Sequence, residues 1–230
     1  MAFIGLAIMT TTKKLKRVTA TLITTKVRQL LFIFMAGKMA QAKQKIVRPL
    51  IAAIAAGYNG GVLYWNQFAD EGEVKDAEAK IWSKNGPRAM RWRDHNSTYR
   101  SGPNKDAGQL MFESLKNNMA DYTGSRLILA GHSLGNQMAI VVAKKLKDGI
   151  NAGNTNSKLK PKRVALLDPY YSNGSKSYIG NQWTGAKARG YVDTLKSWGV
   201  IFEAYRSSSV SNTIFVGDAN KGLLNKAAFL

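Results

Sequence analysis

The pentapeptide Gly-His-Ser-Leu-Gly at residues 131–135 constrains the fold more than any other part of the sequence. A short apolar run at residues 127–130 comes directly before it, and a helical pattern of apolar residues follows it. That pattern has the spacing of one helix face: Leu134, Met138, Val141, Val142 and Leu146. The glycines on either side of the central serine lack a Cβ atom, so strand and helix backbones can approach each other there. The sequence therefore predicts a strand, a sharp turn at Ser133 and a helix.

The position of Ser133 in that turn predicts its chemistry. A serine between a buried strand and a helix is held above the edge of the sheet with its hydroxyl exposed, as in a nucleophile elbow. The backbone N–H of Leu134 then points from a helix N-terminus toward a developing oxyanion. We therefore expect Ser133 to act as a nucleophile and Leu134 to contribute one oxyanion-hole donor. The alternative is a glycine-rich turn with an ordinary capping serine.

A serine nucleophile needs a base, and the base needs a carboxylate that orients it. Asp168 is the candidate carboxylate, because it directly follows a buried apolar run at residues 163–167. The carboxyl end of a parallel strand lies at the sheet edge where ligands bind. A turn-capping aspartate is the alternative interpretation. Asp218 is the rival acid, and Asp193 is expected to be an exposed helix residue.

Two longer motifs connect these residues to a known family. The motifs Gly-His-Ser-Leu-Gly-Asn-Gln at residues 131–137 and Leu-Leu-Asp-Pro at residues 166–169 make the chain similar to bacterial lipase-like members of the α/β-hydrolase superfamily. The stretches at residues 64–72 and 90–92 also resemble that group. The resemblance covers residues 46–217 and implies an α/β-hydrolase fold.

The resemblance also implies hydrolysis of carboxylic esters through an acyl-serine, with Ser133 as nucleophile, Asp168 as acid and Leu134 as one oxyanion donor. The second oxyanion donor belongs to a loop after an earlier strand, where such proteins usually carry a His-Gly dipeptide. This chain has a glycine-rich stretch at residues 55–61 instead. The backbone N–H of Tyr58 is the candidate donor in that stretch.

The catalytic base is the part of the site that the sequence leaves open. In α/β-hydrolases the histidine follows the acid in chain order, but both histidines of this chain, His95 and His132, precede Asp168. His132 lies inside the turn and is expected to be structural or to line the site. His95 follows an expected strand at residues 88–92 and is a candidate base with the wrong chain order. Either the chain stops before the segment with the histidine, or the protein has lost its base.

The first 45 residues differ in composition from the rest of the chain. They contain no acidic residue, although the whole chain has 14, and they contribute strongly to the net charge of +20. Their apolar run at residues 30–36 follows basic residues and precedes an Ala-Gln-Ala sequence, so residues 26–42 resemble a weak export signal. A wrongly assigned start codon and a surface-binding basic tail are the alternatives. We therefore divide the chain into an N-terminal segment, 1–45, and an α/β-hydrolase domain, 46–230, located either outside the cell or in the cytoplasm.

From residue 46 onward, expected strands and helices alternate, which is typical of a parallel sheet with helices on both faces. The expected strands are at residues 46–56, 88–92, 126–130, 163–167, 200–206 and 213–216. The expected helices are at residues 73–83, 104–121, 134–148 and 186–198. The predicted fold class is therefore α/β, α/β-hydrolase-like and truncated at the C-terminus. The aromatic-rich loop at residues 170–185 forms a lid or acyl-binding wall, or it simply packs over the end of the sheet.

Composition narrows the classes of function. The chain has no cysteine and lacks metal-binding and nucleotide-binding motifs, so no cofactor or metal is expected. The leading hypothesis is a lipase-like or esterase-like hydrolase that acts on a small-molecule or lipid ester, with peripheral contact to a lipid surface. The alternative is a hydrolase-like binding protein without a catalytic base. Nucleic-acid binding, which an isoelectric point of about 10.2 suggests, is not expected because no such motif is present.

Overall fold

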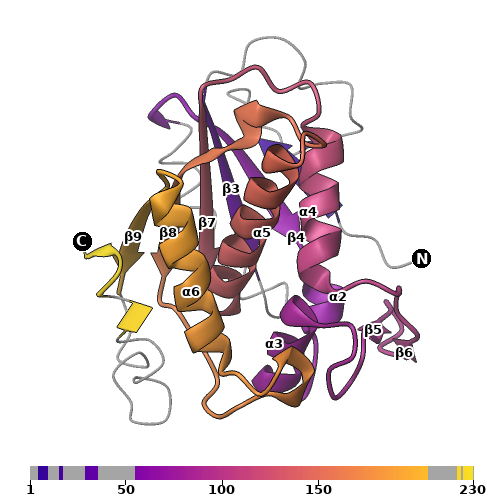
Figure 1. Cartoon of the computed structure of the whole chain (residues 1–230). Coiled ribbons are helices and arrows are strands. Elements are labelled where there is room, and N and C mark those ends of the chain that lie inside the picture. The colour runs from indigo at the N-terminus through magenta and orange to yellow at the C-terminus, as the bar shows by residue number, and fades with distance from the viewer. Residues whose placement is uncertain are drawn as a thin grey trace.

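One large sheet runs through the computed structural model, which describes residues 5–9, 16–17, 29–35, 55–206, 222–223 and 225–229 (Figure 1). Its described strands follow the order β10-β9-β8-β7-β3-β4-β1-β2. They are β1 (Gly5–Met9), β2 (Lys16–Arg17), β3 (Gln29–Met35), β4 (Asn59–Tyr64), β7 (Arg126–His132), β8 (Pro161–Leu167), β9 (Ile201–Tyr205) and β10 (Ala228–Phe229). The strands from β10 to β4 in that order are parallel, whereas β1 pairs antiparallel with β4 and with β2. The predicted α/β class and mostly parallel sheet are confirmed.

Helices cover one face of this sheet side by side, as Figure 1 shows. They are α4 (Ala107–Asn118), α5 (Leu134–Asn151) and α6 (Thr184–Ser197), and with α3 (Val74–Trp82) they confirm the predicted helices. The connections through α4, α5 and α6 all move along the sheet in the same direction, so right-handed crossovers place these helices on the same face. Helices on the second face, which were also predicted, are not among the described residues. Within the described ranges, no helix has the length and apolar character needed to cross a membrane.

The core lies between this helical layer and the sheet, with α5 at its centre against β3, β7 and β8. The inward side chains of α4, Ala107, Met111 and Leu115, and Met119 directly after the helix are almost inaccessible to solvent. The other face of the sheet carries a smaller buried cluster of Ile33, Val62 and Ala130. Packing of α5 over the middle of the sheet fixes its N-terminus at the carboxyl ends of β7 and β8.

The position of β3 corrects the predicted domain boundary at residue 46. This strand pairs in parallel with β7 on one side and β4 on the other, so residues 29–35 lie in the middle of the sheet. Phe32 and Phe34 belong to the main core, whereas Ile33 belongs to the cluster on the opposite face. A strand that is buried on both faces is apolar throughout, and such a run has the same composition as the apolar part of an export signal. The run interpreted as part of a signal in residues 26–42 therefore belongs to the folded domain.

Two further predicted strands differ from the structure. Residues 88–92 do not join the large sheet: β5 (Trp92–Arg93) pairs with β6 (Tyr99–Arg100) in a short antiparallel hairpin. The apolar residue Met90 is buried in the main core from a turn rather than from a strand. The predicted strand at 46–56 lies mostly outside the described residues, and residues 55–57 form a helical turn. The strand expected at 213–216 and the rival acid Asp218 also lie outside them.

A buried ion network holds the chain between β4 and this hairpin. Nζ of Lys80 lies 2.5 Å from Oε1 of Glu71 and donates to the carbonyl oxygens of Phe68, in α2 (Asn66–Ala69), and Arg91. The guanidinium of Arg91 donates to the same carboxylate. Burial raises the pKa of Glu71, but hydrogen bonds from Arg91 and Lys80 outweigh this effect and hold the pKa below its ordinary value.

We expect Phe34→Ala to lower the free energy of unfolding by about 3–5 kcal/mol, because it leaves a cavity in the middle of the sheet. Urea unfolding followed by far-ultraviolet circular dichroism measures this change. Trp183→Ala is the control: Trp183 is 41% exposed, and its removal should change the free energy of unfolding by less than about 0.5 kcal/mol. Equal stability of Phe34→Ala and wild type would mean that residues 29–35 do not belong to the fold.

We expect Glu71→Gln to lower the free energy of unfolding by about 3–5 kcal/mol near neutral pH, because Lys80 is then buried without its counter-charge. The ordinary pKa is 4.5 and the folded-state pKa is lower, so the stabilisation by the carboxylate is complete above 4.5. This stabilisation disappears as the pH falls through the pKa that Glu71 has in the folded state. Urea midpoints measured at decreasing pH should therefore show a narrowing gap between wild type and variant. A gap that is constant with pH would contradict this interpretation.

Candidate active site

The predicted strand, turn and helix are present around Ser133. Strand β7 ends at His132, α5 begins at Leu134, and Ser133 between them has a φ of 55° and a ψ of −121°. A positive φ is unfavourable for a residue with a side chain, so the surrounding structure must hold this turn. A Cβ atom on Gly131 would lie 2.1 Å from the carbonyl oxygen of Gly135. Glycine is required there because strand and helix backbones are in contact.

Asp168 lies at the same edge of the sheet as Ser133. His132 of β7 pairs with Leu167 of β8, and each candidate residue directly follows its member of that pair. Asp168 has a φ of 43°, and its backbone N–H donates to the carbonyl oxygen of Tyr205 on β9 at 2.9 Å. Two neighbouring strands therefore end in tight turns with positive φ, and these turns carry the predicted nucleophile and the predicted acid.

The buried side chain of Asn136 ties the two turns together. Its Nδ2 donates to the carbonyl oxygens of Ser133 at 2.9 Å and Leu167 at 2.8 Å. Its Oδ1 accepts a hydrogen bond from the backbone N–H of Leu167 at 2.8 Å. The N–H of Ser133 donates to the same Leu167 carbonyl oxygen at 3.1 Å. The residue before the acid is thus bonded directly to the turn that carries the nucleophile.

A second polar network lies beside the first turn of α5. Nε2 of Gln137 donates to Oε1 of Glu78 and to the carbonyl oxygen of Tyr170, both at 2.7 Å. The Glu78 carboxylate also accepts hydrogen bonds from the N–H of Ser172 at 3.0 Å, from the Ser172 hydroxyl, and from Oγ1 of Thr184 at 2.8 Å. Both Glu78 and Gln137 are inaccessible to solvent. Helices α3 and α5 and the loop after β8 therefore meet at one carboxylate.

Sequence reasoning missed the polar residues Asn136, Gln137 and Glu78. The available signal was a pair of amides in the first turn of an otherwise apolar helix, and a carboxylate between two alanines on another helix. Neither signal identifies a partner, because the partners of Glu78 lie up to 106 positions away in the sequence.

The structure contradicts the prediction that Tyr58 donates to the oxyanion. Residues 60 and 61 of the glycine-rich stretch belong to β4, and Tyr58 directly precedes this strand. Through β3, residue Asn59 is level with Leu127 at the start of β7. Ser133 lies at the far end of β7, about 20 Å away at the rise of a β-strand. Tyr58 is therefore at the opposite edge of the sheet, where its ring lies 6.0 Å from the guanidinium of Arg126.

The two histidines of the sequence lie on the β5–β6 hairpin and at the end of β7. His95 is exposed in the turn of the β5–β6 hairpin, and no hydrogen bond among the described residues joins it to Ser133. His132 occupies the last position of β7, where pairing with Leu167 holds its backbone in the sheet. That His132 is structural or lines the site stays a prediction.

The loop after Asp168 divides into buried and exposed parts. Tyr171 is fully buried in the core, whereas Trp183 is 41% exposed. Burial raises the pKa of the Tyr171 and Tyr178 hydroxyls, and the Glu78 carboxylate raises it further, so both hydroxyls stay protonated at neutral pH. Tyr171 therefore packs over the end of the sheet, whereas the side chain of Trp183 is exposed to solvent.

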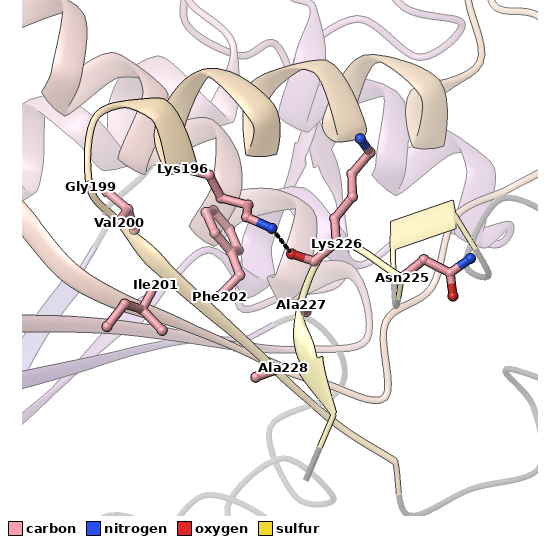
Figure 2. Close-up of a pocket in the computed structure, with 9 residues that line it drawn as sticks. All are labelled: Lys196, Gly199, Val200, Ile201, Phe202, Asn225, Lys226, Ala227 and Ala228. Carbon is pink, nitrogen blue, oxygen red and sulfur yellow. Dashed lines mark hydrogen bonds between the residues drawn. The ribbon is translucent and has the colours of Figure 1, made fainter.

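A cavity of about 450 Å³ lies beside the start of β9, and Figure 2 shows the residues that line it. It is lined by the end of α6, the start of β9 and residues 225–228. Nζ of Lys196 donates to the carbonyl oxygen of Lys226 at 2.7 Å, and Lys226 pairs with Asp193. Asp193 is exposed on α6, as predicted. This cavity does not belong to the candidate active site, because β9 starts at Ile201 and reaches the catalytic edge only at Tyr205.

The described residues form no metal site at the edge of the sheet that carries Ser133 and Asp168. Within the described ranges, no group of three or more His, Cys, Asp or Glu side chains is placed to hold a metal ion. The candidate site combines the hydroxyl of Ser133, the carboxylate of Asp168 and the N-terminus of α5.

Comparison with known proteins gave structural matches only. No protein-family model and no curated protein matches the chain. Thermogutta terrifontis esterase 2 is 9% identical with a TM-score of 0.48, and the match covers 98% of this chain and 76% of that chain. LpqC, a poly(3-hydroxybutyrate) depolymerase from Bordetella parapertussis, is 13% identical with a TM-score of 0.48 over 87% of this chain and 61% of that one. A thioesterase domain from the curacin biosynthetic pathway is 13% identical with a TM-score of 0.48 over 98% and 87%.

Matches with TM-scores below 0.5 carry no argument about function, so the candidate site stands on its own geometry. The strand order, the parallel sheet and the turn between β7 and α5 give this chain an α/β-hydrolase-like fold.

We expect Ser133→Gly to be about 1 kcal/mol more stable to unfolding than Ser133→Ala, because glycine adopts a φ of 55° without a steric penalty. Guanidinium unfolding of the two variants measures the difference. Ser114 on α4 is the matched control: in a regular helix the order reverses, and glycine is about 1 kcal/mol less stable than alanine. The same order at both positions would show that the turn at Ser133 is not strained.

Proposed function

We propose that this chain is a serine hydrolase that cleaves carboxylic esters through an acyl-serine on Ser133. The observation that carries the proposal is the strained turn of Ser133 at the carboxyl edge of the sheet, one strand away from the similar turn of Asp168. A serine held in this way has its hydroxyl exposed and a helix N-terminus directly behind it.

In the proposed reaction, Oγ of Ser133 attacks the ester carbonyl carbon and its proton passes to a base. The backbone N–H of Leu134, at the first position of α5, stabilises the oxyanion that forms. The alcohol leaves with the proton, and water then hydrolyses the acyl-serine to the free acid. Asp168 orients the base.

The proposed substrate is a small-molecule or lipid ester. Trp183 supplies an exposed aromatic surface on the loop after Asp168, where an acyl chain or a lipid surface can contact the protein. The length of the acyl chain that fits is measurable with esters of increasing chain length.

A second candidate function is a hydrolase-like protein that binds esters or acids without cleaving them. The position of His95 favours it, because an exposed histidine on the β5–β6 hairpin is not held beside Ser133. A fold of this kind carries catalysis only when the complete set of groups is present.

The test of the proposed function is hydrolysis of short-chain and long-chain p-nitrophenyl esters, together with labelling by a fluorophosphonate probe. We expect labelling and turnover in the wild type and neither in Ser133→Ala. Asp168→Asn should lower turnover by about 10,000-fold while it keeps the geometry of the turn. Ser197→Ala, which changes an exposed serine on α6, should leave both readouts unchanged.

Labelling of Ser133→Ala at the rate of the wild type would disprove the assignment of the nucleophile. Absence of both turnover and labelling in a folded wild-type protein would favour the binding function. Turnover in the wild type that is lost in His95→Ala would identify His95 as the base.

A further inference from the structure

The turn at Asp168 needs support from both sides. Its φ of 43° is unfavourable for a residue with a side chain, so neighbouring groups must fix the backbone. The direction of the Asp168 carboxylate depends on that backbone. The residues that bind Leu167 before the turn and Tyr170 and Ser172 after it therefore decide where the carboxylate points.

Asn136 supports the turn from the N-terminal side. Its side-chain amide accepts from the N–H of Leu167 and donates to the carbonyl oxygen of the same residue, both at 2.8 Å. The Asn136 amide therefore bonds to the backbone of Leu167 with one donor and one acceptor, as the backbone of a neighbouring strand would. Asn136 is fully buried, so no water competes for these bonds.

Gln137 supports the turn from the C-terminal side. Its Nε2 donates to the carbonyl oxygen of Tyr170, two residues after Asp168, and to Glu78. Its Oε1 accepts from Nε1 of Trp82 at 2.6 Å. Both ends of the amide are therefore engaged, and its orientation is fixed.

Glu78 completes the support through the next part of the loop. It accepts from Gln137, from the N–H and hydroxyl of Ser172, and from the hydroxyl of Thr184, and these described donors are all neutral. A buried carboxylate is tolerated only when hydrogen bonds replace its hydration. Because every one of these donors is needed, the carboxylate holds Ser172 and Thr184 in fixed positions relative to α5.

We propose that Asn136, Gln137 and Glu78 form a clamp that fixes the turn at Asp168 relative to Ser133, and that they are positioning residues for catalysis. Asn136 and Gln137 are consecutive residues in the first turn of α5, the turn that begins at Ser133. The helix that carries the nucleophile therefore holds the acid on both sides. A buried polar network of this kind adds geometric precision that apolar packing does not provide. The catalytic part of this inference rests on the proposed function.

The test compares Glu78→Gln, Gln137→Glu and the double variant, in which carboxylate and amide exchange places. Glu78→Gln replaces one accepting oxygen with an NH2 group and removes the negative charge that strengthens the remaining hydrogen bonds, and Gln137→Glu places two buried carboxylates together. We expect each single variant to lower kcat for a short p-nitrophenyl ester by about 100-fold with KM changed by less than about twofold. The double variant restores the donor and the acceptor between positions 78 and 137, so its kcat should be at least about tenfold above that of either single variant. It should stay below the wild type, because the Tyr170 carbonyl oxygen no longer has a donor.

Hydrogen exchange measures the clamp without reference to activity. In Glu78→Gln, amide exchange in a peptide covering residues 169–184 should become about tenfold faster, because the Ser172 N–H no longer donates to a charged carboxylate and its hydrogen bond is weaker. Exchange in β7 should stay as in the wild type. Glu73→Gln is the matched control: Glu73 precedes α3 and pairs with Lys75 on the surface, so neither kcat nor exchange should change. Ser172→Ala, which removes one hydroxyl and keeps the carboxylate, tests the same loop if Glu78→Gln does not fold.

Three results would overturn the clamp. The first is an unchanged rate of amide exchange in residues 169–184 of Glu78→Gln or Ser172→Ala. The second is exchange in β7 that becomes faster to the same extent as exchange in the loop. The third is a kcat of the double variant that is no higher than that of the single variants. Lack of Ser133-dependent turnover in the wild type would instead reject the proposed function. The exchange measurement would still decide whether the clamp exists, because it does not depend on turnover.

Discussion

The hydrogen-bonded pairing of β7 with β8 is the interaction on which the candidate site depends. Parallel strands in register end at the same edge of a sheet, and the pair formed by His132 and Leu167 brings the turns of Ser133 and Asp168 to neighbouring positions. The next strand pair extends the same edge, since the N–H of Asp168 bonds to Tyr205 on β9. The site is therefore a property of strand register, and residues that are 35 positions apart meet because their strands end together.

Strain and polar support balance each other at this edge. Both turns have positive φ, a conformation that costs free energy for residues with side chains. Close packing at Gly131 and the hydrogen bonds of Asn136 hold the first turn, and the network around Gln137 and Glu78 holds the chain after the second. Buried polar groups are costly unless all of them find partners. Their concentration beside two strained turns is what distinguishes this part of the core from the apolar packing of α4 and α6.

The middle of the sheet illustrates why a local pattern can have two interpretations. Residues 30–36 form an uninterrupted apolar run after basic residues, which fits an export signal and a doubly buried strand equally well. Pairing with β7 and β4 decides between them, and it also places Tyr58 at the opposite edge of the sheet from Ser133. The hairpin of β5 and β6 shows the reverse case, because the apolar residues near Met90 are buried without joining the large sheet.

The sequence by itself determined the elements whose signals are local. Helical periodicity located α3, α4, α5 and α6, and glycine spacing located the turn at Ser133, because backbone sterics and side-chain spacing act within a few residues. The dipeptide Asp168-Pro169 directly after the apolar run at residues 163–167 located the turn at Asp168. Only the tertiary structure decided that β3 lies in the sheet, that Tyr58 lies at the wrong edge, and that Glu78 joins Gln137, Ser172 and Thr184. These contacts join residues far apart in sequence, and their partners are set by strand order and packing rather than by any neighbouring residue.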